Sequence, residues 1–362
     1  MPFSLPLDRS LLSPPGDTIQ ETIDALGMTQ AELAQRMGRP KEKINELIKG
    51  KAPLTMDTAI MLERVLNIPV SFWTNRESAY RETLARIEEQ EALEQDLIWL
   101  DLFPLKVMHQ RGIITTSKKS IVVVRELLLF FGFASSSQWN DYYLNTSDEV
   151  SFRISLRNTP NPGAVAVWLR LGEKKIQTFS LPTYNEKAFR AAMKEFRAIA
   201  KEQPDDFLSK IQLLAATYGV AVVFTPSLPN AKISGAARWI GPTPLIQLSD
   251  LYKTNDQFWF SFFHESCHIL EHSKKEIFLE KLEGTAYNEA KENEANEFAA
   301  NWLIPHAEYA KWTIDNKFFN ADMIRNFAER IGIHPGIVVG RLQHDGKLKP
   351  AYCNDLKVVI KF

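Results

Sequence analysis

His264-Glu265-Ser266-Cys267-His268 is the stretch that decides the fold and chemistry of the C-terminal part of this chain. In a helix, residues four apart lie on one face, one turn apart, so His264 and His268 can direct two imidazoles at one point. Glu265 can reach a water held at that point. Two histidine ligands with a glutamate as general base are the arrangement of zinc peptidases. The motif therefore predicts a Zn²⁺ site with His264 and His268 as ligands and Glu265 as the catalytic residue.

The residues around this motif favour a metal site over a chance match. Residues 258–263 read Phe-Trp-Phe-Ser-Phe-Phe and would bury the helix that carries the motif. Unpaired buried polar groups cost about 1–3 kcal/mol each, and a metal ion would give the two imidazoles a partner. His272 continues the same face, but it lies roughly 12 Å along the helix axis from His264. It cannot share the ion with His264, so a contact to a ligand or a surface position is expected for it.

A second helix, predicted over residues 289–303, should supply the third ligand. Its apolar stripe follows the period of a half-buried helix. The stripe consists of Ala295, Phe298, Ala299, Trp302 and Leu303. Glu297 points away from this stripe and is expected to be solvated. Glu292 and Glu294 lie on its flanks, and periodicity alone does not choose between them.

Together these segments resemble the ImmA/IrrE family of metallo-endopeptidases over roughly residues 215–345. The stretches that carry the resemblance are His264-Glu265-Ser266-Cys267-His268, Glu294-Ala295-Asn296-Glu297-Phe298-Ala299-Ala300, Leu303-Ile304-Pro305, Ser234-Gly235-Ala236-Ala237 and Leu245-Ile246-Gln247-Leu248. In that family the glutamate before the Ala-Asn step is the third zinc ligand, which maps onto Glu294. The resemblance implies limited cleavage of a protein substrate, often a helix-turn-helix repressor.

Two further features of a zincin can be assigned only as candidates. A zincin binds its substrate as an added strand along a sheet edge, and the predicted strand at residues 235–240 is the candidate edge. The sequence does not identify the group that stabilises the oxyanion. Tyr287, Arg238 and His306 are the candidates for that role.

The N-terminal region predicts a helix-turn-helix. A first helix, capped by Asp17 or Thr18, should end at Gly27, and Thr29 should cap a second helix over residues 30–37. Gly38-Arg39-Pro40 makes a turn into a third helix at residues 41–49. Further helices are expected at about residues 55–66 and from residue 69 past residue 94. Between residues 36 and 51 there are six basic and two acidic residues, a local surplus that suits phosphate contact.

This region resembles the Xre-type domain of HigA-like antitoxins over about residues 16–80. The stretches that carry the resemblance are Gly27-Met28-Thr29-Gln30-Ala31-Glu32-Leu33-Ala34, Ile44-Asn45-Glu46-Leu47-Ile48-Lys49-Gly50-Lys51 and Ile68-Pro69-Val70-Ser71-Phe72-Trp73. The likeness implies a set of DNA-facing residues: Gln30, Lys41, Lys43 and Asn45, with Lys49 and Lys51 near phosphates. Arg39-Pro40 departs from the usual pattern, and Glu42 and Glu46 add negative charge. The alternative is a helical module that docks or dimerises.

The whole chain is expected to be an α+β protein with four parts. They are a flexible segment at residues 1–16, the helix-turn-helix domain with a long exit helix at 17–96, a mainly helical spacer at 97–217, and the zincin-like domain with a helical end at 218–362. Within the spacer, residues 164–171 fit a strand or a helix. The pattern of residues 327–342, in the tail, is similar to that of a helix-turn-helix. We expect this segment to have a packing role.

Composition limits the class and location of the protein. The formal net charge is -1, so any nucleic-acid contact must come from a local patch. Two cysteines, Cys267 and Cys353, are too few for a disulfide framework. Residues 1–6 do not read as a signal peptide, and the apolar stretch at 121–134 is interrupted by charges and too short to span a bilayer. A cytoplasmic protein without a membrane partner is expected.

Two functions remain in competition at this point. The first is a DNA-associated zinc endopeptidase that regulates by cutting a protein, such as a repressor or an antitoxin. The second is a DNA-binding regulator or antitoxin of a toxin–antitoxin type system, whose zinc domain senses or scaffolds without cutting. The complete set of His264, Glu265 and His268 favours the first, because a scaffold needs the ligands but has no use for Glu265. An operator read as a palindrome would also predict a homodimer.

Overall fold

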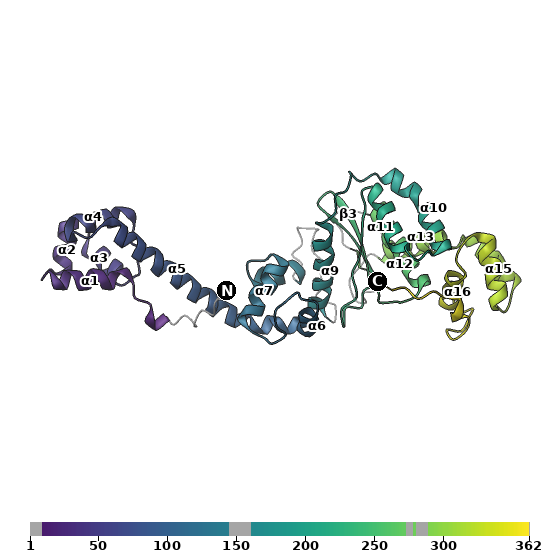
Figure 1. Cartoon of the computed structure of the whole chain (residues 1–362), viewed down its shortest axis with the longest axis horizontal. Helices are drawn as coiled ribbons and strands as arrows, with labels where there is room; N and C mark the ends of the chain where they lie inside the picture. Colours follow the sequence, from purple (N-terminus) through teal and green to yellow (C-terminus); the bar gives the residue numbers. More distant parts are fainter. Residues whose placement is uncertain (1–8, 145–160, 273–277, 280–288, 362) are drawn as a thin grey trace. The chain divides into compact units, whose positions relative to one another are not determined.

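The computed structural model describes residues 9–144, 161–272, 278–279 and 289–361. The chain divides into two compact units, Met1–Ile98 and Trp99–Phe362. The first unit is helical, and the second combines helices with a small sheet (Figure 1). The expected α+β class is therefore confirmed.

The N-terminal unit is built from five α-helices that follow a short 3-10 turn at Arg9–Leu11. They are α1 (Pro15–Ala25), α2 (Gln30–Met37), α3 (Lys41–Ile48), α4 (Met56–Leu66) and α5 (Val70–Gln95) (Figure 1). Thr29 caps α2 as predicted, since its side chain accepts a hydrogen bond from the backbone N–H of Glu32. The predicted cap of α1 is wrong. A proline at the first helical position starts that helix earlier, with Pro14 as its N-cap, and Asp17 lies in the first turn.

The core of this unit holds the three helices around the turn together. Leu33, Ile44 and Leu47 are buried with Trp73 of α5 in one apolar cluster. Helix α1 approaches α3 closely at Gly16, where an added Cβ would lie 2.0 Å from the carbonyl oxygen of Ile48. Only glycine permits that approach. The close packing leaves the opposite, polar face of α3 for solvent or a ligand.

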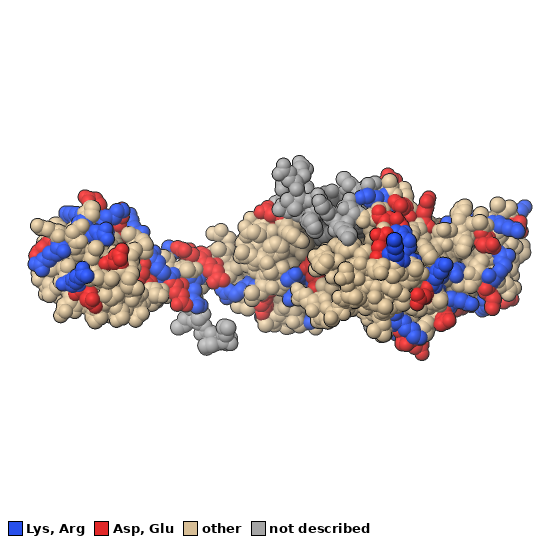
Figure 2. Space-filling model, turned by 90° about the horizontal axis from the view of Figure 1, so that it is seen from above, with Lys and Arg blue, Asp and Glu red and all other residues tan. Residues whose placement is uncertain are grey.

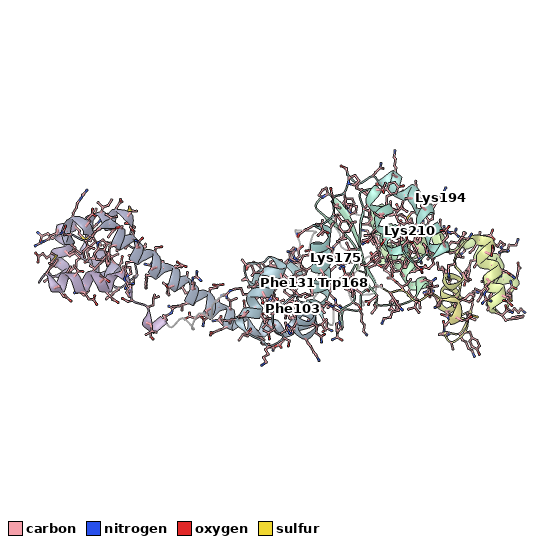
Figure 3. The ribbon with its side chains drawn as sticks, in the orientation of Figure 1. Phe103, Phe131, Trp168, Lys175, Lys194 and Lys210 are labelled. Atoms are coloured by element: carbon pink, nitrogen blue, oxygen red, sulfur yellow. The ribbon has the colours of Figure 1, made fainter. Side chains whose placement is uncertain are left out.

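The spacer region lies largely at the start of the C-terminal unit, and its described secondary-structure elements are all helices. Its elements are a 3-10 helix (Asp96–Leu102), α6 (Leu105–Gln110), α7 (Ile121–Phe131), α8 (Ser136–Tyr143) and α9 (Pro162–Ile176). Residues 164–171, which fitted a strand or a helix, lie within α9. Phe103 and Phe131 pack with Trp139 in an aromatic cluster (Figure 3). Across the described residues, no single helix is long and apolar enough to cross a membrane, although α7 and α8, bent by 46° from each other, pass as a pair by length and composition.

The sheet has the order β1-β3-β2-β4 in the described residues. Its strands are β1 (Ala221–Phe224), β2 (Gly235–Ile240), β3 (Thr243–Leu248) and β4 (Phe278–Leu279). β1 pairs parallel with β3, and the other pairs are antiparallel. The prediction that β2 forms the sheet edge is wrong, because β4 pairs with Ala236 and Ala237 on its free side. A two-residue strand that depends on distant pairing leaves no periodic signal in the sequence.

Helices cover both faces of this sheet. On one face α9 packs against Ala221, Val223 and Leu245 through Ile176. On the other face lie α10 (Glu186–Glu202), α11 (Phe207–Thr217), α12 (Asn255–Glu271) and α13 (Glu289–Leu303) (Figure 1). Phe262 and Phe263 of α12 are fully buried in the larger core on that second face. The aromatic run before the motif thus fixes α12 between the sheet and its neighbouring helices.

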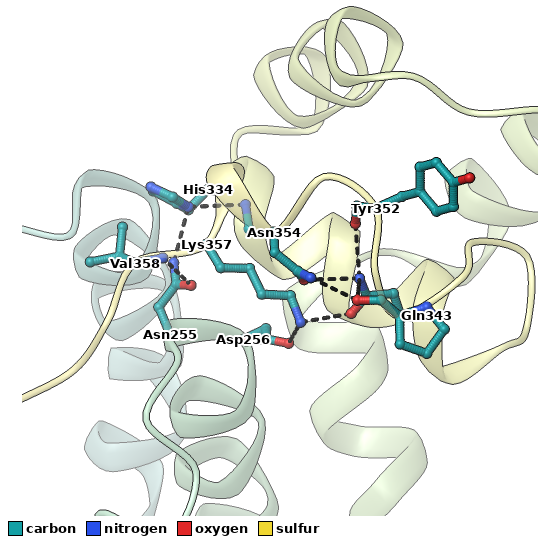
Figure 4. Close-up of polar contacts among 10 residues, drawn as sticks. Asn255, Asp256, His334, Gln343, Tyr352, Asn354, Lys357 and Val358 are labelled. Atoms are coloured by element: carbon teal, nitrogen blue, oxygen red, sulfur yellow. Dashed lines mark hydrogen bonds and ion pairs between the residues drawn. The ribbon is translucent and has the colours of Figure 1, made fainter.

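The C-terminal residues hold the first turn of α12 in place. The chain ends with α14 (His306–Asp315), α15 (Ala321–Ile331), α16 (Pro335–His344) and a 3-10 turn (Asn354–Leu356). The segment that follows returns to α12 (Figure 4). There Val358 N–H donates to the Asn255 side chain at 3.1 Å, and Asn255 N–H donates to the Val358 carbonyl at 2.9 Å. Lys357 Nζ lies 2.8 Å from Asp256 Oδ2, with both side chains largely buried. The tail therefore packs against the helix that carries the motif.

Candidate metal centre

His264 and His268 face each other on one side of α12. Their Nε2 atoms lie 3.0 Å apart, and both side chains are almost completely buried. Burial, and next the neighbouring His264, lower the pKa of His268 to about 2. Its imidazole is therefore neutral at pH 7, which is the form that binds a metal ion.

Glu292 of α13 completes the cluster. Its carboxylate oxygens lie 3.2 Å from His264 Nε2 and 3.6 Å from His268 Nε2. The ligand atoms of these three residues all lie within 4.8 Å of one another. The Glu292 side chain is 26% exposed, so the cluster stays open to solvent on that side. An open position next to three protein ligands is the arrangement of a catalytic rather than a structural zinc site.

The donor set and its spacing fit zinc. Two imidazole nitrogens and a carboxylate oxygen are common zinc ligands in catalytic sites. Ligands at roughly 2.0–2.1 Å from a tetrahedral ion lie about 3.3–3.4 Å from each other. The two Nε2 atoms lie 3.0 Å apart, Glu292 Oε2 lies 3.2 Å from His264 Nε2, and the other oxygen, Oε1, lies 3.6 Å from His268 Nε2, all close to that value. His264, His268 and Glu292 can therefore hold one ion without a change in fold.

The prediction that Glu294 is the third ligand is corrected by this geometry. Two residues along a helix correspond to a turn of about 200°, so Glu292 and Glu294 cannot face the same point. Glu294 instead lies beside His272, with Oε2 3.2 Å from Nε2, and its side chain is 58% exposed. Asn296, four residues after Glu292, lies with Oδ1 3.1 Å from His264 Nδ1. The four-residue spacing of Glu292 and Asn296 places both side chains on the face of α13 that meets His264.

Glu265 lies between the cluster and the sheet. Its side chain is fully buried. Gly235, at the start of β2, makes room for it, since a Cβ there would lie 2.6 Å from Glu265 Oε1. A carboxylate next to a metal-bound water can act as its general base. Glu265 lies on α12 together with both predicted histidines, and its carboxylate faces Gly235 of β2.

A cavity of about 580 Å³ opens onto the cluster, lined by His264 and Glu292. Most of its surface is apolar, and further polar side chains also line it: Asp256, Gln257, Asn296, Glu297, Arg341 and His344. The apolar lining residues are Phe260, Ala300, Leu303, Ile304 and Ile337. A second cavity, of about 720 Å³, shares Ala300, Ile304 and Arg341 with the first. Together they give a hollow beside α13 with room for several side chains of a bound peptide.

Of the three oxyanion candidates, the structure describes Arg238 and His306. Arg238 is buried on the opposite side of the sheet, where its guanidinium lies 2.8 Å from Glu173 and its Nη2 contacts the Leu169 carbonyl of α9. That candidate is therefore wrong, because alternate residues of a strand point to opposite faces. His306 lines the second cavity. Tyr287 lies outside the described residues.

The predicted DNA-facing residues surround α3. Lys41, Lys43, Lys49 and Lys51 are exposed, and Gln30 and Asn45 are half-buried. Gln30 donates to Gln20 at 2.6 Å, and Lys43 pairs with Glu46 at 2.8 Å. Figure 2 shows Lys and Arg side chains on the visible face of this unit, with Asp and Glu side chains among them. The exposed surface of α3 is thus mixed in charge.

The fold and the cluster define a helix-turn-helix protein whose second unit is zincin-like. Two family models match it: residues 215–343 match the IrrE N-terminal-like domain of peptidase family M78, and residues 19–73 match the helix-turn-helix family. The uncharacterized HTH-type transcriptional regulator YddM of Escherichia coli (strain K12) is 36% identical over 75 residues, which are 21% of this chain and 78% of that protein. The chain therefore carries a helix-turn-helix domain of the transcriptional-regulator type at residues 19–73 and an IrrE-like domain of peptidase family M78 at residues 215–343. The two domains expected from the sequence, IrrE-like and helix-turn-helix, are confirmed.

Proposed function

We propose that this protein is a DNA-binding regulator that acts as a zinc-dependent endopeptidase on a protein partner. The observation that carries the proposal is the convergence of His264 and His268 of α12 with Glu292 of α13 within 4.8 Å, next to Glu265 on α12. A scaffold would need the three ligands but not the carboxylate. A helix-turn-helix repressor or an antitoxin is the proposed partner, and the cytoplasm, where DNA and such partners meet, is the proposed location.

In this mechanism the chain supplies the ligands, the base and the substrate pocket. A zinc ion held by His264, His268 and Glu292 would polarise the scissile carbonyl and lower the pKa of a water. Glu265 takes a proton from the attacking water and passes it to the leaving amine. The apolar cavity beside His264 and Glu292 receives a large apolar side chain next to the scissile bond. Burial of that side chain would favour its binding by about 1.5–3 kcal/mol.

Removal of the metal tests the proposal. The full chain, loaded with zinc, is incubated with a proteome-derived peptide library, and new termini are identified by mass spectrometry. We expect cleavage at a restricted set of sites next to large apolar residues, because the cavity is apolar on most sides. A chelator should abolish this cleavage, and zinc should restore it where magnesium does not. Cleavage that persists after chelation would contradict a zinc-dependent mechanism.

The N-terminal unit is proposed to bind DNA through α3. Lys41 and Lys49 stand at the two ends of this helix and are exposed. In a helix-turn-helix the second helix enters the major groove, and basic residues around it contact phosphates. Two copies of the chain would read a palindromic operator.

Loss of either lysine should weaken binding to any duplex sequence. Each phosphate contact contributes about 0.9 to the slope of log Kobs against log salt, so Lys41→Ala and Lys49→Ala should each lower that slope by about 0.9. Fluorescence anisotropy with a labelled duplex at several salt concentrations measures it. Lys43→Ala should change the slope less, because Lys43 already pairs with Glu46. An unchanged slope in both Lys41→Ala and Lys49→Ala would argue against α3 as the docking helix.

A further inference from the structure

His272, one turn beyond the metal-ligand pair, connects His268 to Glu294. His268 Nδ1 lies 2.8 Å from His272 Nδ1, and His272 Nε2 lies 3.2 Å from Glu294 Oε2. The His272 side chain is only 3% exposed, whereas that of Glu294 is 58% exposed. A buried imidazole thus links a candidate metal ligand to a carboxylate at the surface.

The carboxylate of Glu294, at the surface end of these contacts, determines which ring nitrogens of His272 and His268 carry protons. An ionised carboxylate can only accept hydrogen bonds, so His272 Nε2 must carry the proton that it donates to Glu294. A neutral His272 then offers Nδ1 as an acceptor. His268 consequently donates from Nδ1 and keeps the lone pair on Nε2, the atom that faces His264 and Glu292. That lone pair is the one a metal ion would use.

We propose that His272 and Glu294 form a positioning relay, which fixes the tautomer and the ring orientation of His268 toward the metal. The proposal rests on the metal centre proposed above. His264 is held differently, because its Nδ1 faces the Asn296 side chain at 3.1 Å. Outer partners of this kind hold the ligand ring and raise its basicity, and their loss typically weakens metal binding 10–100-fold. Glu294 thus acts through His272 rather than on the metal.

Zinc affinity of the full chain, measured by competition with a chromophoric chelator, tests the relay. His272→Leu removes both ring nitrogens and should weaken binding about 10–100-fold. His272→Asn should recover most of this loss, because its side-chain oxygen can accept the His268 Nδ1–H. Glu294→Gln should weaken binding less than about tenfold, since it is exposed and retains one acceptor oxygen. Glu289→Gln removes the same charge from an exposed position on α13 that lines neither cavity and should leave the affinity unchanged.

A second measurement separates positioning from a merely structural role. In ¹⁵N spectra of the zinc-loaded protein, the His268 ring should carry its proton on Nδ1, and the signal of that proton should be lost or broadened in His272→Leu but retained in His272→Asn. If His272→Leu binds zinc as tightly as the wild type, the relay is wrong and the proposed metal centre still stands. Wild-type protein that binds no zinc would instead overturn the metal centre on which the relay rests.

Discussion

Glu265→Gln should lower the rate of peptide-bond cleavage by about 10²–10⁴-fold while zinc binding stays at the wild-type level. The side chain keeps its size, so it still fits the space that Gly235 leaves beside it. The amide cannot take a proton from water, and general-base catalysis of this kind contributes a factor of that order. The peptide-library assay, performed on the variant and the wild type at equal zinc content, measures the effect.

The variant also separates the two functions that compete for this fold. A chain that only senses or scaffolds through its metal would keep its full biological activity with glutamine at position 265. A variant with wild-type cleavage would contradict the role of Glu265. DNA binding by the N-terminal unit is the internal control, because the substitution lies in the other compact unit.

Glu292→Gln should weaken zinc binding by more than about 100-fold, beyond the range typical of groups that only orient a ligand. Glu292 is the carboxylate whose oxygens lie 3.2 and 3.6 Å from the two Nε2 atoms. Glutamine keeps the shape but replaces an anionic ligand with a neutral amide. Chelator competition on the full chain gives the affinity.

Glu294→Gln is the matched comparison, because it makes the same chemical change two residues away on α13. Its zinc affinity should fall less than about tenfold, because Glu294 acts on the metal only through His272. The reverse order of the two effects would show that Glu294 is the ligand, as the family pattern first suggested. The comparison therefore distinguishes the two assignments without any knowledge of the substrate.

The active helix and its partner could be predicted from sequence because their signals are local. The spacing of His264 and His268, the aromatic run before them and the apolar stripe of the next helix all repeat at the helical period. The structure accordingly places the motif on α12 (Asn255–Glu271) and gives α13 the predicted bounds, Glu289–Leu303. The helix-turn-helix could be predicted for the same reason, since signals such as the Thr29 cap of α2 are also local.

The third ligand could not be chosen by periodicity because its position depends on how α13 is rotated against α12. That rotation is set by Ala295, Ala299 and Leu303, which are buried on the inner face of α13. It brings Glu292 to the histidines and turns Glu294 toward His272. The stripe alone left both glutamates on its flanks.

Two predictions about β2 were wrong, its place at the sheet edge and the oxyanion role of Arg238, because contacts between distant segments decide both. Such contacts also occur outside the sheet. Arg238 pairs with Glu173, which lies 65 residues earlier, and Lys357 pairs with Asp256 about a hundred residues before it. The partner of Ala236 and Ala237 is a two-residue strand. No spacing rule within one segment predicts such pairs, because they depend on how distant segments pack.

The zinc content of the purified full chain, determined by elemental analysis beside His264→Ala, is the most direct test of the metal centre. We expect about one zinc per wild-type chain, since the three ligand residues form a single cluster, and loss of that zinc in the variant. A wild-type chain that takes up no zinc even when zinc is supplied, or a variant that retains it fully, would rule out a metal centre at these residues.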